Sequence, residues 1–455
     1  MENHDIKDEF WKKSSKLVPG RPSQVKVNCF ENSSPSTYPD DLEVGVRCSH
    51  KVVANYLDCS MSEIISVGPV AGINKAKINL SQNLSKDLLE FQISTMYNSC
   101  VKCSDKPDEK DFAIVHSHLK NINDDVRVEN KLTKFQRLLE YKPLVLKDVQ
   151  LLSWTGIPRE YRPIVWRLLA GYLPTNIEQR PAIMEQKRIT YLNLVKQYFA
   201  KDTIDSYHTI YKQIQVDIPR MSPATVLFQQ QTVQEMFQRI LFVWAVRHPG
   251  SGYVQGMNDL VTPFFIVFLQ EFLPAEVDID TFKVNTLSKE QHDIVEADSF
   301  WCFSKFIDAI QDNYVFAQVG IQRRVNQMKE LVQRVDENLH KHLLNNGVDY
   351  LQFSLRWMNN MLTREIPLHC SIRLWDTYLA ESDSFASFHS YVCAAFLLLW
   401  KEELIHKQDF QELMIMLQNL PTQNWTDLNI EMLLAEAYKL KFLFSDAPNH
   451  LQSNG

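Results

Sequence analysis

Apolar residues recur at helical spacing through most of the chain between Lys131 and Phe444. In the clearest stretch, apolar side chains fall at i, i+3, i+4, i+7, i+8 and i+11, which places them along one side of a helix. These residues are Val233, Met236, Phe237, Ile240, Leu241 and Trp244. Pro249 and Gly250 follow and end the pattern. The stretch therefore predicts an amphipathic helix that packs against a core.

The same spacing returns in three other segments. They contain Tyr191, Leu194, Val195 and Tyr198; Phe410, Leu413, Met414 and Leu417; and Ile430, Leu433, Leu434 and Ala437. Two continuous apolar runs, Leu260–Leu269 and Tyr391–Trp400, reach only half of the ~20 residues that cross a membrane, so they predict buried core helices. Alternating, strand-like patterns are nearly absent. The chain is therefore predicted to be all-α, and about 310 residues suffice for two helical lobes.

Polar residues divide the chain into three parts. Residues 1–130 are rich in Ser, Asn, Asp and Lys without a sustained helical period, so a largely disordered N-terminal region is expected. Residues 131–445 form the predicted helical domain, and residues 446–455 form a short polar tail. Within the domain, Pro274–Glu296 interrupts the apolar pattern with charged residues, which predicts a surface loop.

Composition and charge narrow the range of functions. A formal net charge of −7 and a pI near 6.0 provide no global basic field, so nucleic acid is a disfavoured partner. The charged first residues do not resemble a signal peptide, and no apolar run is long enough for a transmembrane segment. The 8 cysteines follow no regular framework, so reduced thiols and a cytoplasmic location are expected.

The first candidate for chemistry is the segment Asp217-Ile-Pro219-Arg220, which lies between two predicted helices. Pro219 disfavours the α region for Ile218, so Arg220 is expected on extended or turning backbone. Asp217 is close enough to hold the guanidinium or to cap the following turn. An arginine placed in this way can be aimed at an anion. The alternative is a surface arginine in a connection between helices.

The second candidate is the loop Gly250-Ser-Gly-Tyr-Val-Gln-Gly-Met-Asn-Asp259. The whole chain has only 12 glycines, so three within seven residues indicate a backbone that needs positive φ or close approach. Gln255 is uncharged, hydrogen-bonding and flanked by Gly256, and it is a candidate for reaching another molecule's active site. Asn258 and Asp259 suit the start of the next helix. The alternative is an interhelical turn with a capping amide.

A third element, Arg162-Pro-Ile-Val-Trp166, follows Gly156-Ile-Pro158. Its i, i+4 spacing allows the guanidinium to lie over the indole. We interpret this pair as organising the fold. The segments Arg356-Trp357 and Arg373-Leu-Trp-Asp376 are likewise interpreted as helix packing with buried or half-buried ion pairs.

These segments follow one another in a recognisable order. An R-x-x-x-W element contains Arg162 and Trp166, an I-x-x-D-x-x-R element contains Asp217 and Arg220, and a Y-x-Q element contains Tyr253 and Gln255. Together with Glu296-Ala-Asp298 downstream, they resemble the TBC domain, the catalytic module of Rab GTPase-activating proteins, from about Lys131 to Phe444. More narrowly, the sequence is similar to the member twenty-two type of TBC protein in four segments, Asp217–Pro223, Arg247–Pro249, Gly252–Gly256 and Asp446–His450.

The resemblance implies a two-lobed TBC domain that acts on a Rab-family GTPase in its GTP state. It implies that Arg220 neutralises the charge that develops on the phosphates and that Gln255 positions the attacking water, so both are predicted to be catalytic. By motif position, four further residues are expected to orient them. These are Asp217, Tyr253, Asn258 and Asp259. No cofactor or metal of its own is expected, because GTP and Mg²⁺ are carried by the partner GTPase.

The implied role is regulation of vesicle trafficking from the cytoplasm, with peripheral association on Golgi or other endomembranes. The N-terminal region is expected to bind other proteins or to serve localisation, because a polar chain buries too little apolar area to fold alone. A rival hypothesis is a non-catalytic adaptor that binds a Rab with the same helical fold. The presence of both Arg220 and Gln255 favours the activator. A zinc site at Cys100, Cys103, His116 and His118 is disfavoured, because the histidine spacing does not fit a zinc finger.

Overall fold

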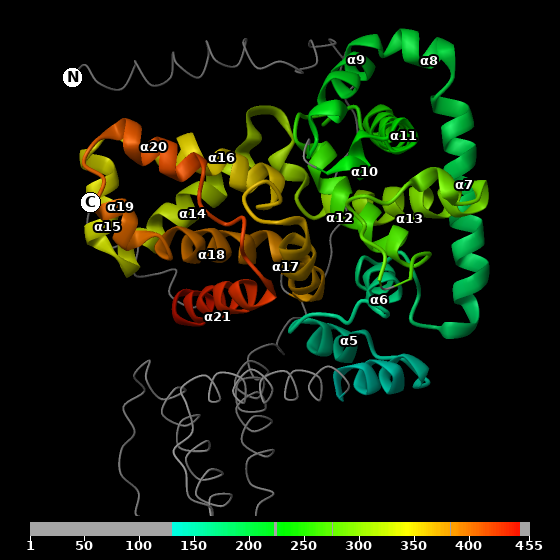
Figure 1. The fold of residues 1–455 in the computed structure, drawn as a ribbon, viewed down its shortest axis with the longest axis horizontal. Helices are drawn as coiled ribbons and strands as arrows, with labels where there is room; N and C mark the ends of the chain where they lie inside the picture. The colour runs from blue at the N-terminus through cyan, green and yellow to red at the C-terminus, as the bar shows by residue number, and fades with distance from the viewer. Residues whose placement is uncertain (1–129, 223–224, 275, 383, 446–455) are drawn as a thin grey trace, which may run out of the picture. The chain divides into compact units, whose positions relative to one another are not determined.

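The computed structural model describes residues 130–222, 225–274, 276–382 and 384–445, which belong to one unit of the chain. Every regular element within these residues is helical, and the segment 130–140 is the first helix (Figure 1). The predicted all-α fold class is therefore confirmed. The predictions for residues 1–129 and 446–455 lie outside the described residues.

A first group of helices runs from α5 to α13. Its members are α5 (Leu146–Ser153), α6 (Arg162–Leu169), α7 (Arg180–Tyr198), α8 (Lys201–Ser206), α9 (His208–Asp217), α10 (Val226–Gln229), α11 (Gln231–Arg247), α12 (Met257–Gln270) and α13 (Lys289–Asp308), with 3₁₀ turns η1 (Ile177–Gln179), η2 (Ile218–Arg220) and η3 (Val284–Thr286). Helix α13 packs against α12, α11 and α7. All six positions of the predicted apolar stripe on α11 are buried, and α12 is buried along almost its whole length. These two helices form the centre of the first group.

A second group runs from η4 to α21. Its members are η4 (Gln311–Asn313), η5 (Phe316–Gln318), α14 (Val319–Val335), α15 (Glu337–Asn345), α16 (Tyr350–Asn360), α17 (Leu368–Ala380), α18 (Phe385–Leu398), α19 (Lys401–Ile405), α20 (Phe410–Gln418) and α21 (Asp427–Phe444). Helix α18 packs against α14, α16, α17 and α21. Helix α17 also contacts α5, α6 and α12, and Figure 1 shows it between the two groups. The groups correspond to the two predicted lobes.

Two local predictions are wrong in part. Phe410 was expected on a buried stripe, but it is 45% exposed at the first position of α20, where only Leu413 and Leu417 of that stripe are fully buried. The predicted loop Pro274–Glu296 ends early, because Ser288 forms a capping box and starts α13 at Lys289. The charged residues of the first turns of α13 obscured a helix in the sequence pattern.

A buried histidine lies in the core of the second group. The Nε2 of His389 lies 3.0 Å from the Trp357 carbonyl oxygen, and its Nδ1 lies 2.6 Å from the Tyr378 hydroxyl. Since a carbonyl can only accept, Nε2 carries the hydrogen and the Tyr378 hydroxyl donates to Nδ1. Burial away from water, opposed by the carbonyl of Trp357, lowers the pKa of His389 to about 3. The imidazole is therefore neutral in the folded protein.

We expect this histidine to make stability depend on pH. Between pH 6.5 and about 3, the unfolded chain binds a proton at His389 that the folded chain excludes. The free energy of unfolding should therefore rise with pH across this window, by up to about 1.4 kcal/mol per pH unit. Urea unfolding of the wild type and His389→Gln at several pH values tests this, because the variant should show a shallower slope. Parallel curves would contradict the expectation, and His406→Gln, at an exposed site, is the control.

Candidate functional site

The arginine segment begins where α9 runs directly into the 3₁₀ turn η2. Ile218 adopts α-helical backbone angles, φ −59° and ψ −48°, so the expectation that Pro219 excludes this conformation is wrong. Proline is tolerated there because it stands in the first turn of a new short helix, where its missing N–H costs no hydrogen bond. The turn is closed by the Met221 amide, which donates to the Ile218 carbonyl at 3.0 Å. Arg220 thus lies on turning backbone with an exposed side chain.

Asp217 turns away from Arg220 and into the protein. Its side chain is buried, and Oδ2 accepts hydrogen bonds from the Tyr253 hydroxyl and the Gln213 amide, each at 3.1 Å. Its side chain makes no capping bond to the turn, so the expectation that it holds the guanidinium or caps the turn is not met. Burial and the Asp217 carboxylate raise the pKa of the Tyr253 hydroxyl well above its ordinary value. Tyr253 therefore remains a protonated donor that joins the arginine segment to the glutamine loop.

The glutamine loop uses its glycines as the sequence indicates. Gly252 and Gly256 have positive φ angles of 62° and 102°. A side chain at Gly256 would collide with the amides of Asn359 and Asn360 as well as strain the backbone. The side chain of Gln255 is exposed, whereas its backbone carbonyl accepts a hydrogen bond of 2.9 Å from Asn359 Nδ2. At Gly256, the close approach that the sequence predicts is made by the chain's own second lobe.

Asn258 and Asp259 lie in the first turn of α12, as expected, although the residue before the helix is Gly256. Both side chains are buried. Asn258 Oδ1 accepts from the Tyr253 hydroxyl at 3.4 Å, and Asp259 Oδ2 pairs with Arg364 Nε at 2.7 Å. Burial, opposed by the Arg364 charge, raises the pKa of Asp259 to about 6. The first turn of α12, which directly follows the glutamine loop in sequence, thus carries a buried carboxylate.

Three of the four predicted orienting residues meet at one hydroxyl, the fourth, Asp259, pairs with Arg364, and the predicted catalytic side chains lie outside these contacts. Asp217, Tyr253 and Asn258 share the tyrosine hydroxyl. Arg220 and Gln255 are exposed, and within the described ranges their side chains make no hydrogen bond or ion pair. That both tips point into one concave surface remains a prediction. The part of the chain that the structure describes contains no His, Cys, Asp and Glu cluster suited to a metal ion.

Arg162 and Trp166 organise the fold through a shared carboxylate. Asp376 on α17 accepts from Arg162 Nε at 3.0 Å and from Trp166 Nε1 at 2.7 Å. The indole stacks with Trp375 at 6.5 Å between ring centroids. We expected the guanidinium to lie over the indole, but the described residues show no such contact, because Asp376 draws the guanidinium to itself. The pair fixes α6 to α17.

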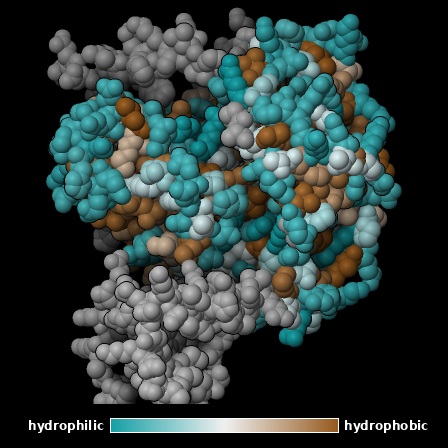
Figure 2. Space-filling model, viewed as in Figure 1, coloured by the Kyte–Doolittle hydropathy of each residue, from teal (hydrophilic) through white to brown (hydrophobic). Residues whose placement is uncertain are grey.

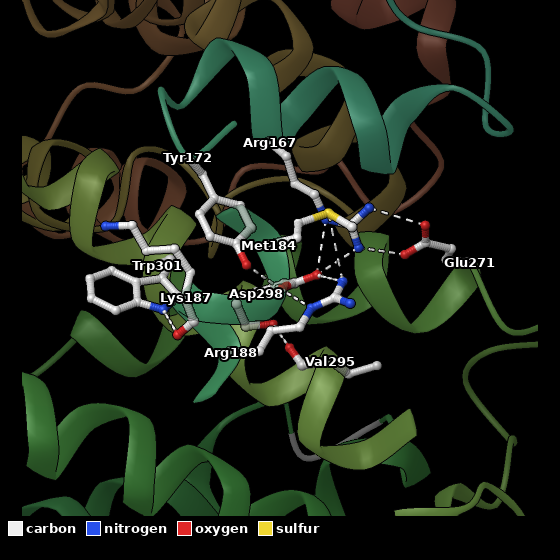
Figure 3. A network of polar contacts seen from close by, with 10 residues as sticks. Arg167, Tyr172, Met184, Lys187, Arg188, Glu271, Val295, Asp298 and Trp301 are labelled. Carbon is white, nitrogen blue, oxygen red and sulfur yellow. Dashed lines mark hydrogen bonds and ion pairs between the residues drawn. The ribbon is translucent and has the colours of Figure 1, made fainter. Parts of the chain in front are cut away.

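The sequence did not reveal the partners of the acidic motif on α13. Asp298 is fully buried and accepts from Arg167, Arg188 and Tyr172, as Figure 3 shows. Although burial acts to raise it, the charges of Arg167 and Arg188 hold the pKa of Asp298 below its ordinary value. Glu296 similarly pairs with Arg239 at 2.8 Å. These ion pairs join α6, α7 and α11 to α13 within the first group of helices.

A two-lobed helical body that exposes an arginine turn and a glutamine loop is the arrangement that the resemblance to the TBC domain implies. The family described as Rab-GTPase-TBC domain matches residues 159–405, and this chain belongs to that family. TBC1 domain family member 22B of Homo sapiens is 54% identical over 325 residues, which cover 71% of this chain and 64% of that protein. The GTPase-activating protein gyp1 of Schizosaccharomyces pombe is 47% identical over 328 residues, covering 71% and 63%. The chain therefore spans a little under two thirds of these relatives.

A solved structure supports the same conclusion. The crystal structure of the Ypt/Rab-GAP domain of Gyp1p superposes with a TM-score of 0.65 at 44% sequence identity, covering 70% of this chain and 99% of that domain. The resemblance to the TBC domain and to its member twenty-two type is thus confirmed. In the described residues, none of the helices combines the length and the apolar character needed to span a bilayer.

Proposed function

We propose that this protein is a GTPase-activating protein for a Rab-family GTPase and that Arg220 and Gln255 act in the partner's active site. The observation that carries the proposal is the hydrogen bond between Asp217 Oδ2 and the Tyr253 hydroxyl. This buried contact ties the arginine turn to the glutamine loop, while both candidate side chains are exposed. The relatives named as GTPase-activating proteins support the same activity.

The proposed chemistry follows from what slows GTP hydrolysis. Negative charge moves toward the leaving oxygens in the transition state, and the attacking water needs orientation. The planar guanidinium of Arg220 can bridge two phosphate oxygens and neutralise this charge. The carboxamide of Gln255 can both donate to and accept from a water molecule. The partner carries GTP, the substrate, together with its Mg²⁺. Faster hydrolysis would return that Rab to its GDP state and so regulate vesicle trafficking.

We expect the full-length chain to accelerate single-turnover GTP hydrolysis by at least one member of a panel of GTP-loaded Rab proteins. Phosphate release, measured as a function of the concentration of the chain, provides both the maximal rate and the half-saturating concentration. Binding without acceleration would support the non-catalytic adaptor instead. A chain with neither binding nor acceleration across the panel would contradict both readings of the site.

A further inference from the structure

We propose that Asn359, Asn360 and Arg364 form a clamp that positions the Gln255 loop from the second lobe. This proposal rests on the proposed function, because it concerns how the glutamine is presented to a GTPase. The three residues lie at the end of α16 and just after it, about a hundred positions from the loop in sequence. They are positioning residues, since they act through the loop and not on the reacting atoms.

The clamp contacts the glutamine loop at Gln255 and Gly256 and the first turn of α12 at Asp259. Asn359 Nδ2 donates to the backbone carbonyl of Gln255 at 2.9 Å. Asn359 and Asn360 together fill the space next to Gly256, where any side chain would collide with them. Asn360 and Arg364 then hold Asp259 Oδ2 at 3.1 Å and 2.7 Å. The backbone is therefore fixed at and directly after the residue whose side chain is exposed.

The segment that carries the clamp has an unusual backbone. Met361 and Leu362 follow α16 with φ angles of 51° and 65°, and both are fully buried. Large side chains rarely adopt such left-handed angles, and residues held in them concentrate at functional sites. Behind the turn, the Tyr314 hydroxyl donates to the Asn359 carbonyl at 2.9 Å, and Asn313 donates to the Met358 carbonyl at 3.3 Å. The surrounding lobe thus holds the strained turn and aims its amides at the loop.

The geometry explains why an exposed glutamine needs outside support. Within the described ranges, the Gln255 side chain has no hydrogen-bonding partner of its own, so its direction depends on the backbone of its loop. Asn359 bonds the carbonyl of that same residue, which removes a degree of freedom next to the side chain. Misplacement of a catalytic group by about 1 Å can cost about 100-fold in rate. We infer that the clamp lowers the cost of bringing the carboxamide to the water.

The first test needs no GTPase. Hydrogen–deuterium exchange of residues 252–257 in the free full-length chain should be about fivefold faster in Asn359→Ala than in the wild type, since one hydrogen bond is lost. Asn346→Ala is the matched control, because its amide donates to the His342 carbonyl at a helix end, at 2.9 Å, away from the loop. Arg364→Gln is the second clamp variant; because it removes the cation that pairs with the buried Asp259, its unfolding free energy is measured beside the exchange to separate a loosened loop from a destabilised fold. Unchanged loop exchange in both clamp variants would overturn the proposal.

The second test separates positioning from general damage. With a Rab that the wild type stimulates, Asn359→Ala should lower the maximal rate by roughly five- to tenfold and leave the half-saturating concentration unchanged. In a Gln255→Ala background the same substitution should have no further effect, because the side chain it positions is gone. An equal loss in both backgrounds would show that Asn359 does not act through Gln255. If the wild type stimulates no Rab, the proposed function fails, while the exchange experiment still decides whether the clamp exists.

Discussion

Arg220→Ala should lower the stimulated rate of GTP hydrolysis by about 10³- to 10⁵-fold, which is the effect typical of an arginine supplied in trans to a GTPase. The loss corresponds to roughly 4 to 7 kcal/mol of activation free energy. Arg220 is exposed, and the buried contact of its turn is made by Asp217, so the fold should not change. Single-turnover phosphate release at saturating concentration of the variant measures the effect. Binding of the GTP-loaded Rab should be largely retained.

Arg220→Lys should lose most of the stimulation as well, because an ammonium group acts as a point charge and cannot bridge two phosphate oxygens. If only positive charge mattered, lysine would restore most of the rate. Arg137→Ala removes an exposed arginine of the helix 130–140 and is the matched control. Wild-type turnover by Arg220→Ala would remove this arginine from the mechanism.

The residues of the candidate site that could be predicted are those whose role is indicated by their immediate neighbours in the sequence. Arg220 directly follows Pro219 and Gln255 is followed by Gly256, which permits close approach, so each could be nominated from its neighbours and from the TBC resemblance. The partner of Asp217 could not, because helix propensity says nothing about a tyrosine 36 positions away. Asn359 was missed for the same reason. Its contact with Gln255 spans 104 positions and exists only because α16 ends beside the loop.

The fold shows a similar division. Helix α11 was predictable from its sequence because its apolar residues follow a helical period, and the structure buries that apolar stripe. Helices α12 and α18 lack such a period because they are buried all round, and they were recognised from their continuous apolar runs. The start of α13 was hidden by its exposed charges, while Glu296 and Asp298 in the same helix are buried. Burial of charge is the feature that periodicity could not predict, since it depends on arginines from other helices.

The acidic pair on α13 should therefore contribute strongly to stability. Asp298 Oδ2 lies 2.7 Å from Arg167 Nη2 and 2.6 Å from Arg188 Nη2, and Oδ1 accepts from the Tyr172 hydroxyl at 2.7 Å. Figure 3 shows the carboxylate between the two guanidinium groups. Arg167 is only 2% exposed, and its other carboxylate partner, Glu271, is 39% exposed. Without Asp298, a buried cation would keep only one partner, at the edge of the protein.

Asp298→Ala should lower the free energy of unfolding by about 3 to 5 kcal/mol, because removing one member of a buried ion pair leaves the other charge desolvated and unpaired. Urea unfolding at neutral pH measures this. Asp308→Ala, on the same helix, breaks a pair with Lys305 in which both side chains are half exposed, and it should change stability by about 0.5 kcal/mol or less. Equal effects of the two substitutions would contradict the argument from burial.

The pH dependence of the same variant provides an independent check. The pKa of Asp298 is lowered in the folded protein, so the unfolded chain binds a proton there more readily than the folded chain does. The stabilisation by Asp298 is accordingly complete above the ordinary carboxyl pKa of 3.8 and is lost as the pH falls through the folded-state pKa. The difference in unfolding free energy between wild type and Asp298→Ala should therefore stay constant near neutral pH and narrow in acid. A difference that widened in acid would mean that Asp298 is not held ionised by Arg167 and Arg188.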